Sequence, residues 1–178
     1  IIYRRLNLNK KVVPIDINEK PYRTFEGGYV KAPQVGRHSW VVSFDLNSLY
    51  PNLIVQYNMS PETLVEDTQM NDVAYYLSGQ AVTSPYAVAA NGSSYRKDFD
   101  GVLPQIIEEY YDERVSVKKM QLAAQKQIQK GYTFELDKEI NTMENRQMAI
   151  KILLNSLYGA LGNKHFAHFD VRIAEGIT

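Results

Sequence analysis

The stretch Ser43-Phe44-Asp45-Leu46-Asn47-Ser48-Leu49-Tyr50-Pro51 decides how this sequence is interpreted. The apolar run at residues 40–44 overlaps its start and is typical of a buried strand. Asp45 then lies at the tip of that strand, where a carboxylate is costly unless a partner such as a divalent cation neutralises it. Ser48 is suited to cap the short helix that follows, and Pro51 is tolerated in its first turn. The pattern favours a compact site for a metal-bound, phosphate-bearing ligand, although a helix N-cap is an equally good reading of Asp45.

Composition limits the classes of protein. The chain has 178 residues, 44% of them hydrophobic, which is enough for a core and for one or two domains. Its 20 basic and 20 acidic residues cancel, so net charge does not identify a nucleic-acid partner and local patches have to be considered instead. The lack of cysteine excludes disulfides and thiolate metal sites. No apolar run approaches the roughly 18 residues of a membrane span, so no membrane partner is expected.

The two ends of the sequence indicate a piece of a larger protein. The chain begins at Ile1 without a methionine, and it stops at Thr178 inside a predicted helix whose N-cap is Asp170. Residues 1–39 are polar and irregular, and they predict a linker with short strands. The segment 60–84 is mixed and predicts no clear element.

Local signals predict a β-hairpin followed by two long helices. Asn91-Gly92 lies between two strand-like runs within residues 86–96 and favours a type I′ turn. A first helix is expected from about Pro104 to Lys130, with Gly131 as a left-handed stop residue. A second helix is expected from residue 134 or 135 to residue 157, ending at Gly159. The short connection between them requires antiparallel neighbours, so the sequence predicts a projecting helical hairpin.

Basic and polar side chains recur on one face of each predicted helix. Arg114 and Lys118 share a face at spacing i, i+4. Lys151, Asn155 and Tyr158 share a face of the second helix at i, i+4 and i+7. If the two faces point the same way, three cations converge where a triphosphate and its metal would bind. Taken alone, each cation is more often a solvated surface charge, and it is their joint occurrence with Asp45 that favours the site.

Two long stretches resemble motifs of family B DNA polymerases. Asp45-Leu-Asn-Ser-Leu-Tyr50-Pro51 is similar to the first polymerase motif, Asp-x-x-Ser-Leu-Tyr-Pro. Lys151-Ile-Leu-Leu-Asn155-Ser-Leu-Tyr158-Gly159 is similar to the second, Lys-x-x-x-Asn-Ser-x-Tyr-Gly, and the order along the chain is that of the family. Phe25-Glu-Gly27-Gly28 resembles the family's Tyr-x-Gly-Gly element, with phenylalanine in place of tyrosine. The sequence around these motifs is most similar to that of replicative polymerases of tailed bacteriophages.

The resemblance implies a role for each matching residue. Asp45 and the Leu46 carbonyl would hold catalytic Mg²⁺, of which the complete enzyme uses two ions. The backbone amides of Ser48, Leu49 and Tyr50 would hold the β- and γ-phosphates. The ring of Tyr50 would lie under the deoxyribose and exclude ribonucleotides. Four side chains would bind the triphosphate from the two helices: Arg114, Lys118, Lys151 and Asn155. Four residues would contact the nascent base pair or the DNA: Tyr158, Gly159, Gly27 and Gly28.

The implied fold class is α+β: a partial polymerase palm, a β-sheet with flanking helices, carrying an antiparallel two-helix fingers subdomain. Four segments are expected: an N-terminal approach at 1–39, the first part of the palm at 40–101, the fingers at 102–160, and a return into the palm at 161–178. The family's third motif, Asp-Thr-Asp-Ser, is absent, and so are the upstream exonuclease acids. The second catalytic carboxylate is therefore missing, and the isolated chain is expected to be inactive.

The function implied is template-directed DNA synthesis in viral replication, in the cytoplasm of an infected bacterial host. The expected partners are a DNA primer-template and a dNTP, with a sliding clamp and replisome proteins reached through regions outside this chain. Two alternatives remain open. A non-catalytic nucleic-acid-binding helical module would bind DNA in a salt-sensitive way without metal-dependent dNTP binding. A purely structural helical hairpin would bind neither.

Overall fold

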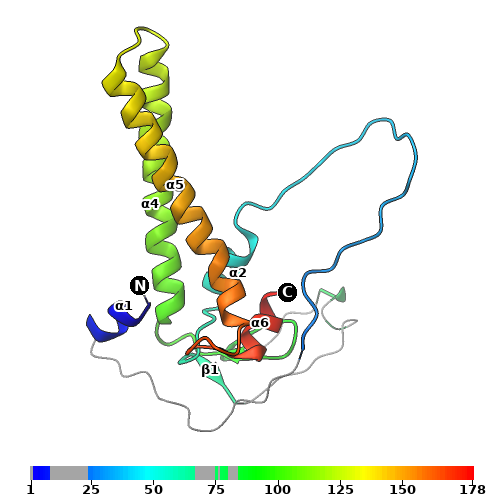
Figure 1. The fold of residues 1–178 in the computed structure, drawn as a ribbon. Helices are drawn as coiled ribbons and strands as arrows, with labels where there is room; N and C mark the ends of the chain where they lie inside the picture. The colour runs from blue at the N-terminus through cyan, green and yellow to red at the C-terminus, as the bar shows by residue number, and fades with distance from the viewer. Residues whose placement is uncertain (1, 9–23, 67–74, 76, 80–83) are drawn as a thin grey trace.

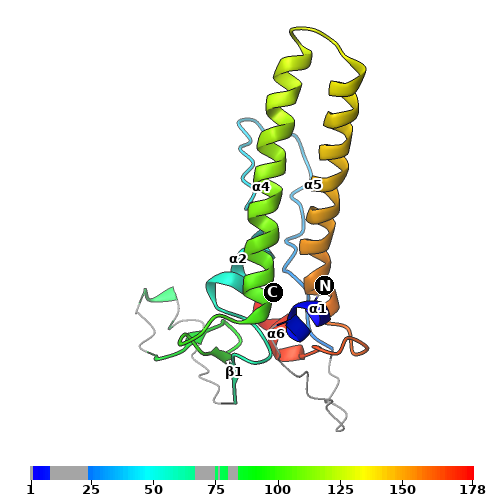
Figure 2. The same cartoon turned by 90° about the vertical axis from the view of Figure 1, so that its left-hand side faces the viewer.

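A long helical hairpin rises from a small mixed base (Figures 1 and 2). The computed structural model describes all residues except 1, 9–23, 67–74, 76 and 80–83. The elements follow one another as α1 (Ile2–Leu8), α2 (Leu49–Gln56), β1 (Leu64–Val65), β2 (Ala87–Val88), β3 (Ser94–Tyr95), α4 (Val102–Ile128), α5 (Phe134–Leu161) and α6 (Val171–Ile177). Helices with a small antiparallel sheet confirm the α+β class.

Helices α4 and α5 form the predicted antiparallel hairpin, and they project together away from the base (Figures 1 and 2). Thr133 begins α5, where its side-chain oxygen accepts a hydrogen bond from the Leu136 amide at 3.2 Å. Between the helices, the Arg146 guanidinium pairs with Glu113 at 2.6 Å. The buried side chains Val117 and Ile150 add apolar contact surface to the two long helices.

The ends of the two long helices differ from the expected ones. Helix α4 ends at Ile128, and Gly131 does not adopt the left-handed conformation expected of a stop residue. Helix α5 continues through Gly159 to Leu161, with Gly162 at its C-cap. Glycine tolerates a helical conformation at a cost of about 1 kcal/mol, and the packing of Leu161, which is fully buried, favours the longer helix.

The sheet at the base has the strand order β1-β3-β2, with both pairs antiparallel. The predicted hairpin is confirmed: Ala87 lies opposite Tyr95, and Val88 lies opposite Ser94. The predicted type I′ turn is wrong. Only Gly92, at φ 84°, is left-handed, and its amide donates to the Ala89 carbonyl at 2.9 Å. This is a longer hairpin loop with a single left-handed glycine.

The core lies where the base meets the foot of the helical hairpin. Apolar side chains from α2, β3, α4, α5 and α6 form one buried cluster; its largest fully buried members are Ile54, Met59, Tyr95, Leu103, Ile107, Leu161 and Ile173. Asp170 begins α6 as predicted, because its carboxylate accepts a hydrogen bond from the Arg172 amide at 3.0 Å. The short helix α6 contacts both α5 and α2.

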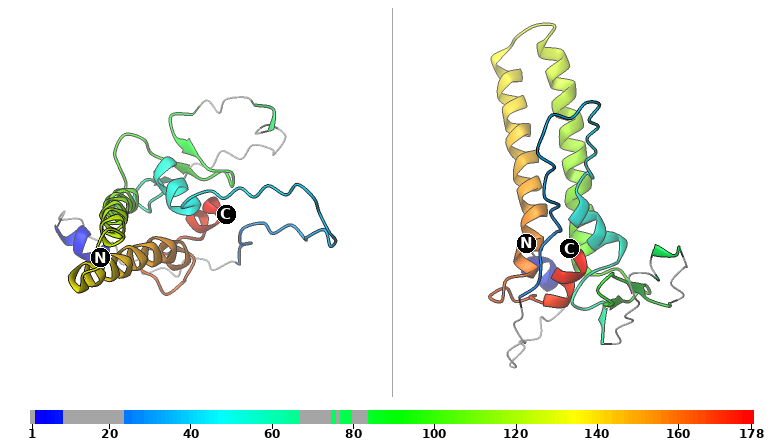
Figure 3. Two further views of the ribbon diagram at one scale, coloured as in Figure 1. Left: turned by 90° about the horizontal axis from the view of Figure 1, so that it is seen from above. Right: turned by 90° about the vertical axis from the view of Figure 1, so that its right-hand side faces the viewer.

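The expected buried strand at residues 40–44 is wrong. This segment is irregular, and it extends away from the base as part of the long connection before α2 (Figures 1 and 3). Trp40 is 99% exposed and Phe44 is 92% exposed. A strand needs a neighbour for its backbone hydrogen bonds, and β1, β2 and β3, which are the strands within the described residues, do not pair with it. Apolar composition therefore did not suffice to make a strand here.

The expected N-terminal linker with short strands also needs correction. Residues 2–8 form helix α1, and residues 24–39 contain no strand. Residues 9–23 lie outside the described part of the chain. Of the segment 60–84, for which no element was expected, residues 64–65 form strand β1. None of the described helices combines the length and the apolar character of a membrane span.

Candidate nucleotide and DNA site

The two tyrosines of the quoted motifs lie against each other. Tyr50 on α2 and Tyr158 on α5 have ring centroids 4.7 Å apart and ring planes inclined by 47°. Aromatic pairs at this separation and tilt attract each other by more than their buried area alone provides. The fold thus brings together stretches 45–51 and 151–159, which the sequence places far apart.

The turn before α2 sets where Tyr50 lies. Ser48 is left-handed, with φ 52° and ψ 45°, and α2 begins directly after it. The expected side-chain cap from Ser48 is wrong, since its hydroxyl donates to the Asn47 side chain at 3.3 Å instead. The turn is closed by Asn52, whose side-chain amide donates to the Asn47 carbonyl at 2.9 Å. A further contact that the sequence did not indicate joins Asn47 to the Tyr111 hydroxyl of α4 at 3.4 Å.

The glycine-containing segment at residues 25–28 contacts the same tyrosine. A Cβ placed on Gly28 would lie 2.7 Å from the Tyr50 hydroxyl, whereas a Cβ on Gly27 would meet no atom within 4 Å. The Phe25 ring lies against Gly162, and the Glu26 carbonyl accepts from the Thr178 hydroxyl at 3.1 Å. Of the two predicted DNA-contact glycines, Gly28 therefore lies beside the predicted nucleotide-contact tyrosine. Sequence reasoning missed the Thr178 contact, because the two residues are remote in sequence and carry no recognisable spacing.

The Tyr158 hydroxyl stays protonated near neutral pH. Burial raises the pKa of the Tyr158 hydroxyl above its ordinary value, and the neighbouring Tyr50 raises it further, while a hydrogen bond with Thr178 acts in the opposite direction. A neutral phenol both donates and accepts hydrogen bonds. With the Tyr50 ring beside it, this hydroxyl belongs to a partly apolar surface, of the kind that a sugar ring or a base pair can contact.

The predicted triphosphate-binding side chains lie on the two long helices, Arg114 and Lys118 on α4 and Lys151 and Asn155 on α5. Lys118, Lys151 and Asn155 are exposed, and Arg114 is half-buried. The Arg114 Nε atom is buried without a hydrogen-bond partner among the described residues. In that same part of the chain, none of the three cations forms a salt bridge with a carboxylate. Their charges are therefore available to an anion.

The predicted metal ligands do not form a complete site by themselves. Asp45 and Leu46 are exposed, in the irregular segment that leads to α2. Carboxylate and carbonyl oxygens are the donors that Mg²⁺ prefers, so their chemistry fits the ion. Within the described residues, no group of three or more histidine, aspartate or glutamate side chains gathers to hold a metal. The set therefore fits one part of a metal site whose remaining carboxylates the described residues do not supply.

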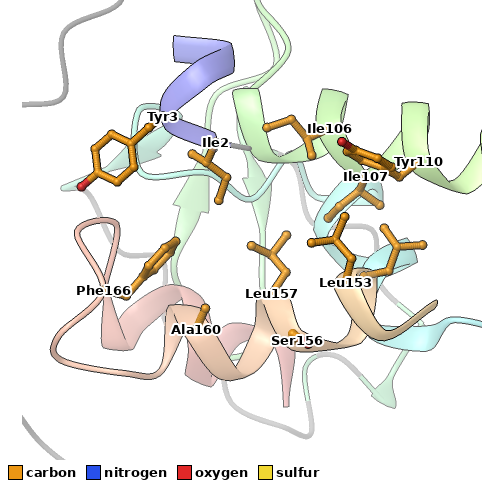
Figure 4. A pocket seen from close by; sticks show the side chains of 11 residues that line it. Ile2, Tyr3, Ile106, Ile107, Tyr110, Leu153, Ser156, Leu157, Ala160 and Phe166 are labelled. Atoms are coloured by element: carbon orange, nitrogen blue, oxygen red, sulfur yellow. The ribbon is translucent and has the colours of Figure 1, made fainter. Parts of the chain in front are cut away.

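The helices also enclose an apolar cavity of about 260 Å³, shown in Figure 4. Ile2 and Tyr3 of α1 face residues of α4 and α5 across it, and Phe166 closes one end. None of the predicted site residues lines this cavity, and no charged side chain does. Neither ring of the Tyr50–Tyr158 pair lines it.

Comparison with known proteins covers the whole chain. The family model described as DNA polymerase family B matches residues 1–178. A DNA-directed DNA polymerase of Escherichia phage RB69 is 33% identical over 100% of this chain and 24% of its own length. DNA polymerase 1 of Pyrococcus abyssi is 30% identical over 99% of this chain and 21% of its own length.

A solved structure supports the same relationship. The family B DNA polymerase from Pyrobaculum calidifontis matches with a TM-score of 0.64 and 26% identity, over 99% of this chain and 21% of that one. The chain spans about a quarter of the length of the curated relatives it matches. Archaeal and phage enzymes thus match over almost the same span, and because the family model covers every residue, this chain belongs to DNA polymerase family B.

Proposed function

We propose that this chain is the part of a template-directed DNA polymerase that binds the incoming dNTP and the nascent base pair. The observation that carries the proposal is the contact between Tyr50 and Tyr158, with ring centroids 4.7 Å apart. This contact joins the two motif stretches at one place, with Gly28 beside them. A surface built from both motifs is what a nucleotide needs if its sugar and base lie on one side and its phosphates on the other.

The proposed division of labour follows the chemistry of the side chains. The ring of Tyr50 lies under the deoxyribose, and Tyr158 with Gly159 borders the base pair. Arg114, Lys118 and Lys151 neutralise the triphosphate, to which cations bind by charge-assisted hydrogen bonds. Asn155 and the backbone amides of residues 48–50 complete the phosphate contacts. Gly27 and Gly28 allow the DNA backbone to approach, since neither carries a side chain.

The proposed reaction is nucleotidyl transfer in the complete enzyme. The primer 3′-hydroxyl attacks the α-phosphate of the dNTP in line, and pyrophosphate leaves. Asp45 and the Leu46 carbonyl would hold part of a pair of Mg²⁺ ions, which when bound lower the charge on the attacking and leaving oxygens. Positioning and charge neutralisation supply most of the catalysis in such transfers. Because the second catalytic carboxylate is missing, we expect this chain by itself to bind ligands without turning them over.

The proposed setting is viral replication in the cytoplasm of an infected bacterium, on a primer-template. Clamp and replisome proteins would bind to other parts of the polymerase. The similarity to a phage enzyme over the whole chain supports this setting, and the archaeal relatives leave the proposed chemistry unchanged.

A second candidate function is nucleic-acid binding without catalysis. It is favoured by one observation: the described residues assemble no three-carboxylate cluster, while Lys118 and Lys151 are exposed. In this alternative the basic residues follow DNA phosphates, and Asp45 has no catalytic partner.

Binding of a labelled dNTP to a primer-template complex of the purified chain, with and without Mg²⁺, separates the two functions. The polymerase proposal predicts Mg²⁺-dependent dNTP binding that Asp45→Asn weakens. The alternative predicts that DNA binding is salt-sensitive and that Mg²⁺ does not change the binding of the dNTP. Primer extension by residues 1–178 alone would contradict the requirement for a second carboxylate.

A further inference from the structure

Three polar side chains just after α2 contact the first turn of α4. They are Asn58, Ser60 and Glu62, and their partners lie 40 to 43 residues further along the chain. Gly101, the N-cap residue of α4, has no side chain with which to cap the helix itself. The cap of this long helix is therefore supplied from the end of another helix.

The hydrogen bonds account for every free amide of that first turn. The Gly101 amide donates to Asn58 Oδ1 at 2.8 Å, and the Val102 amide donates to Glu62 Oε1 at 2.6 Å. The Leu103 amide donates to Ser60 Oγ at 3.4 Å, and Pro104 has no amide hydrogen to satisfy. Residues 101–104 are buried, where an unpaired amide is costly. The Glu62 carboxylate also lies at the positive end of the helix dipole, where negative charge is favourable.

Asn58 has a second role through its backbone. It is left-handed, at φ 54°, and directly follows the C-cap of α2. Its amide donates to the Val55 carbonyl at 3.1 Å, and the Met59 amide donates to the Ile54 carbonyl at 2.8 Å. These are the two bonds of a Schellman motif, which asparagine tolerates better than most residues. One residue therefore ends α2 with its main chain and begins α4 with its side chain.

The surroundings hold this link rigidly. The Asn58 side-chain nitrogen donates to the carbonyls of Arg96 and Phe99, at 2.7 and 2.8 Å. Ser60 is fully buried, and its hydroxyl donates to Glu62 Oε2 at 2.6 Å. A Cβ on Gly101 would lie 2.6 Å from the Ser60 Cβ, so only glycine allows the two segments to approach this closely.

We propose that Asn58 and Glu62 are positioning residues for nucleotide binding, because they join the end of the helix that carries Tyr50 to the start of the helix that carries Arg114 and Lys118. The inference rests on the proposed function and adds residues to it that lie outside both motif stretches. Loosening the link leaves each helix intact but lets the phosphate-binding cations move relative to the sugar-binding ring. The ground-state affinity for dNTP is then lost before the chemical step is affected.

Three substitutions in a full-length polymerase that carries this segment test the inference. Asn58→Gly keeps the left-handed backbone and removes the side chain, so α2 still ends in the same way. Asn58→Asp keeps the acceptor for Gly101 and removes the two donor bonds. Glu62→Gln keeps an acceptor for Val102 and removes the charge. Glu139→Gln, at an exposed glutamate on α5, is the matched control.

Hydrogen exchange and steady-state kinetics are measured together. For Asn58→Gly we expect at least tenfold faster exchange of the Gly101 amide, with the KM for dNTP raised about fivefold or more and kcat within twofold. Glu62→Gln should give a smaller rise in KM, and the control should change neither quantity.

An active parent enzyme whose Asn58→Gly and Asn58→Asp variants keep the parental KM would overturn the inference, as would unchanged protection of the Gly101 amide in Asn58→Gly. A parent that incorporates no nucleotide would instead reject the proposed function, and the two failures are therefore distinguishable.

Discussion

Tyr50 and Tyr158 are the point where the two motif stretches meet, with ring centroids 4.7 Å apart and planes inclined by 47°. The first ring stands on α2, and the second stands on α5 near the foot of the helical hairpin. Because each ring limits the movement of the other, the position of the proposed sugar-contact surface depends on both helices. Gly28, in a third segment of the chain, lies close to the Tyr50 hydroxyl and limits the space around it.

Removing the ring of Tyr50 should weaken discrimination against ribonucleotides. A ring that lies where a 2′-hydroxyl would be excludes the extra oxygen sterically, so in the full-length enzyme Tyr50→Ala should raise relative ribonucleotide incorporation by about tenfold or more. The measurement is the ratio of kcat/KM for a dNTP to that for the matching ribonucleotide. Tyr50→Phe keeps the ring and should keep the ratio. An unchanged ratio in Tyr50→Ala would refute the role given to this ring.

Adding a methyl group at Gly28 should disturb the same ring. The new Cβ of Gly28→Ala would lie 2.7 Å from the Tyr50 hydroxyl, which is closer than atoms tolerate, so the tyrosine must move. We expect weaker sugar discrimination in Gly28→Ala and its recovery in the double variant with Tyr50→Phe, which lacks the clashing hydroxyl. Gly27→Ala is the control, since its Cβ would meet nothing within 4 Å. Equal effects at the two glycines would contradict the steric explanation.

Lys151 should contribute to nucleotide use through its charge. In the full-length enzyme, Lys151→Ala should lower kcat/KM for dNTP by the equivalent of about 1.5–3 kcal/mol, the usual value of a hydrogen bond to a charged group. Single-nucleotide incorporation measures this loss. Lys138→Ala removes an exposed charge near the far end of the same helix and should have no such effect. A Lys151→Ala enzyme with parental efficiency would count against the triphosphate contact.

Two isoleucines on α5 should differ sharply in their effect on stability. Ile150 is 6% exposed and belongs to the core cluster, whereas Ile152 is 60% exposed. Ile150→Ala should lower the free energy of unfolding of the chain by about 2–5 kcal/mol, because it removes buried methyl groups and leaves a cavity. Ile152→Ala should change it by no more than about 0.5 kcal/mol. Urea unfolding of both variants tests the packing of α5, and equal losses would contradict it.

Alkaline pH should destabilise the chain through Tyr95. This tyrosine is fully buried, and burial together with nearby Asp170 raises the pKa of its hydroxyl well above 10. Because the pKa is higher in the folded state, the contribution of Tyr95 to the free energy of unfolding is fully present below a pH of about 10. It is lost as the pH rises further, because the unfolded chain then releases the proton more readily. Thermal unfolding between pH 8 and roughly pH 11 measures the slope. Tyr95→Phe should flatten it, and an unchanged slope would assign the effect to other tyrosines.

Several features of the protein were decided by short-range chemistry and were readable from the sequence. The helical hairpin follows from two long helical patterns joined by a short connection, and Asp170 begins α6 because a carboxylate satisfies a free amide locally. The hairpin at residues 86–96 was also predictable from the sequence, but its turn type was not. Asn91-Gly92 is compatible with more than one loop, and the observed strand register corresponds to the longer one. The motif stretches identified the family without any coordinates.

Tertiary structure decided which distant residues meet, and whether an apolar run is covered. The stretch 40–44 has the composition of a strand, but backbone hydrogen bonding needs a neighbouring strand, and in the described part of the chain none pairs with it. The contact of Tyr50 with Tyr158 and the cap that Asn58 and Glu62 supply to α4 join segments far apart in sequence. No local spacing encodes such contacts, because they depend on how whole helices pack. The sequence by itself determined the family and the two long helices, and only packing determined how the elements form a site.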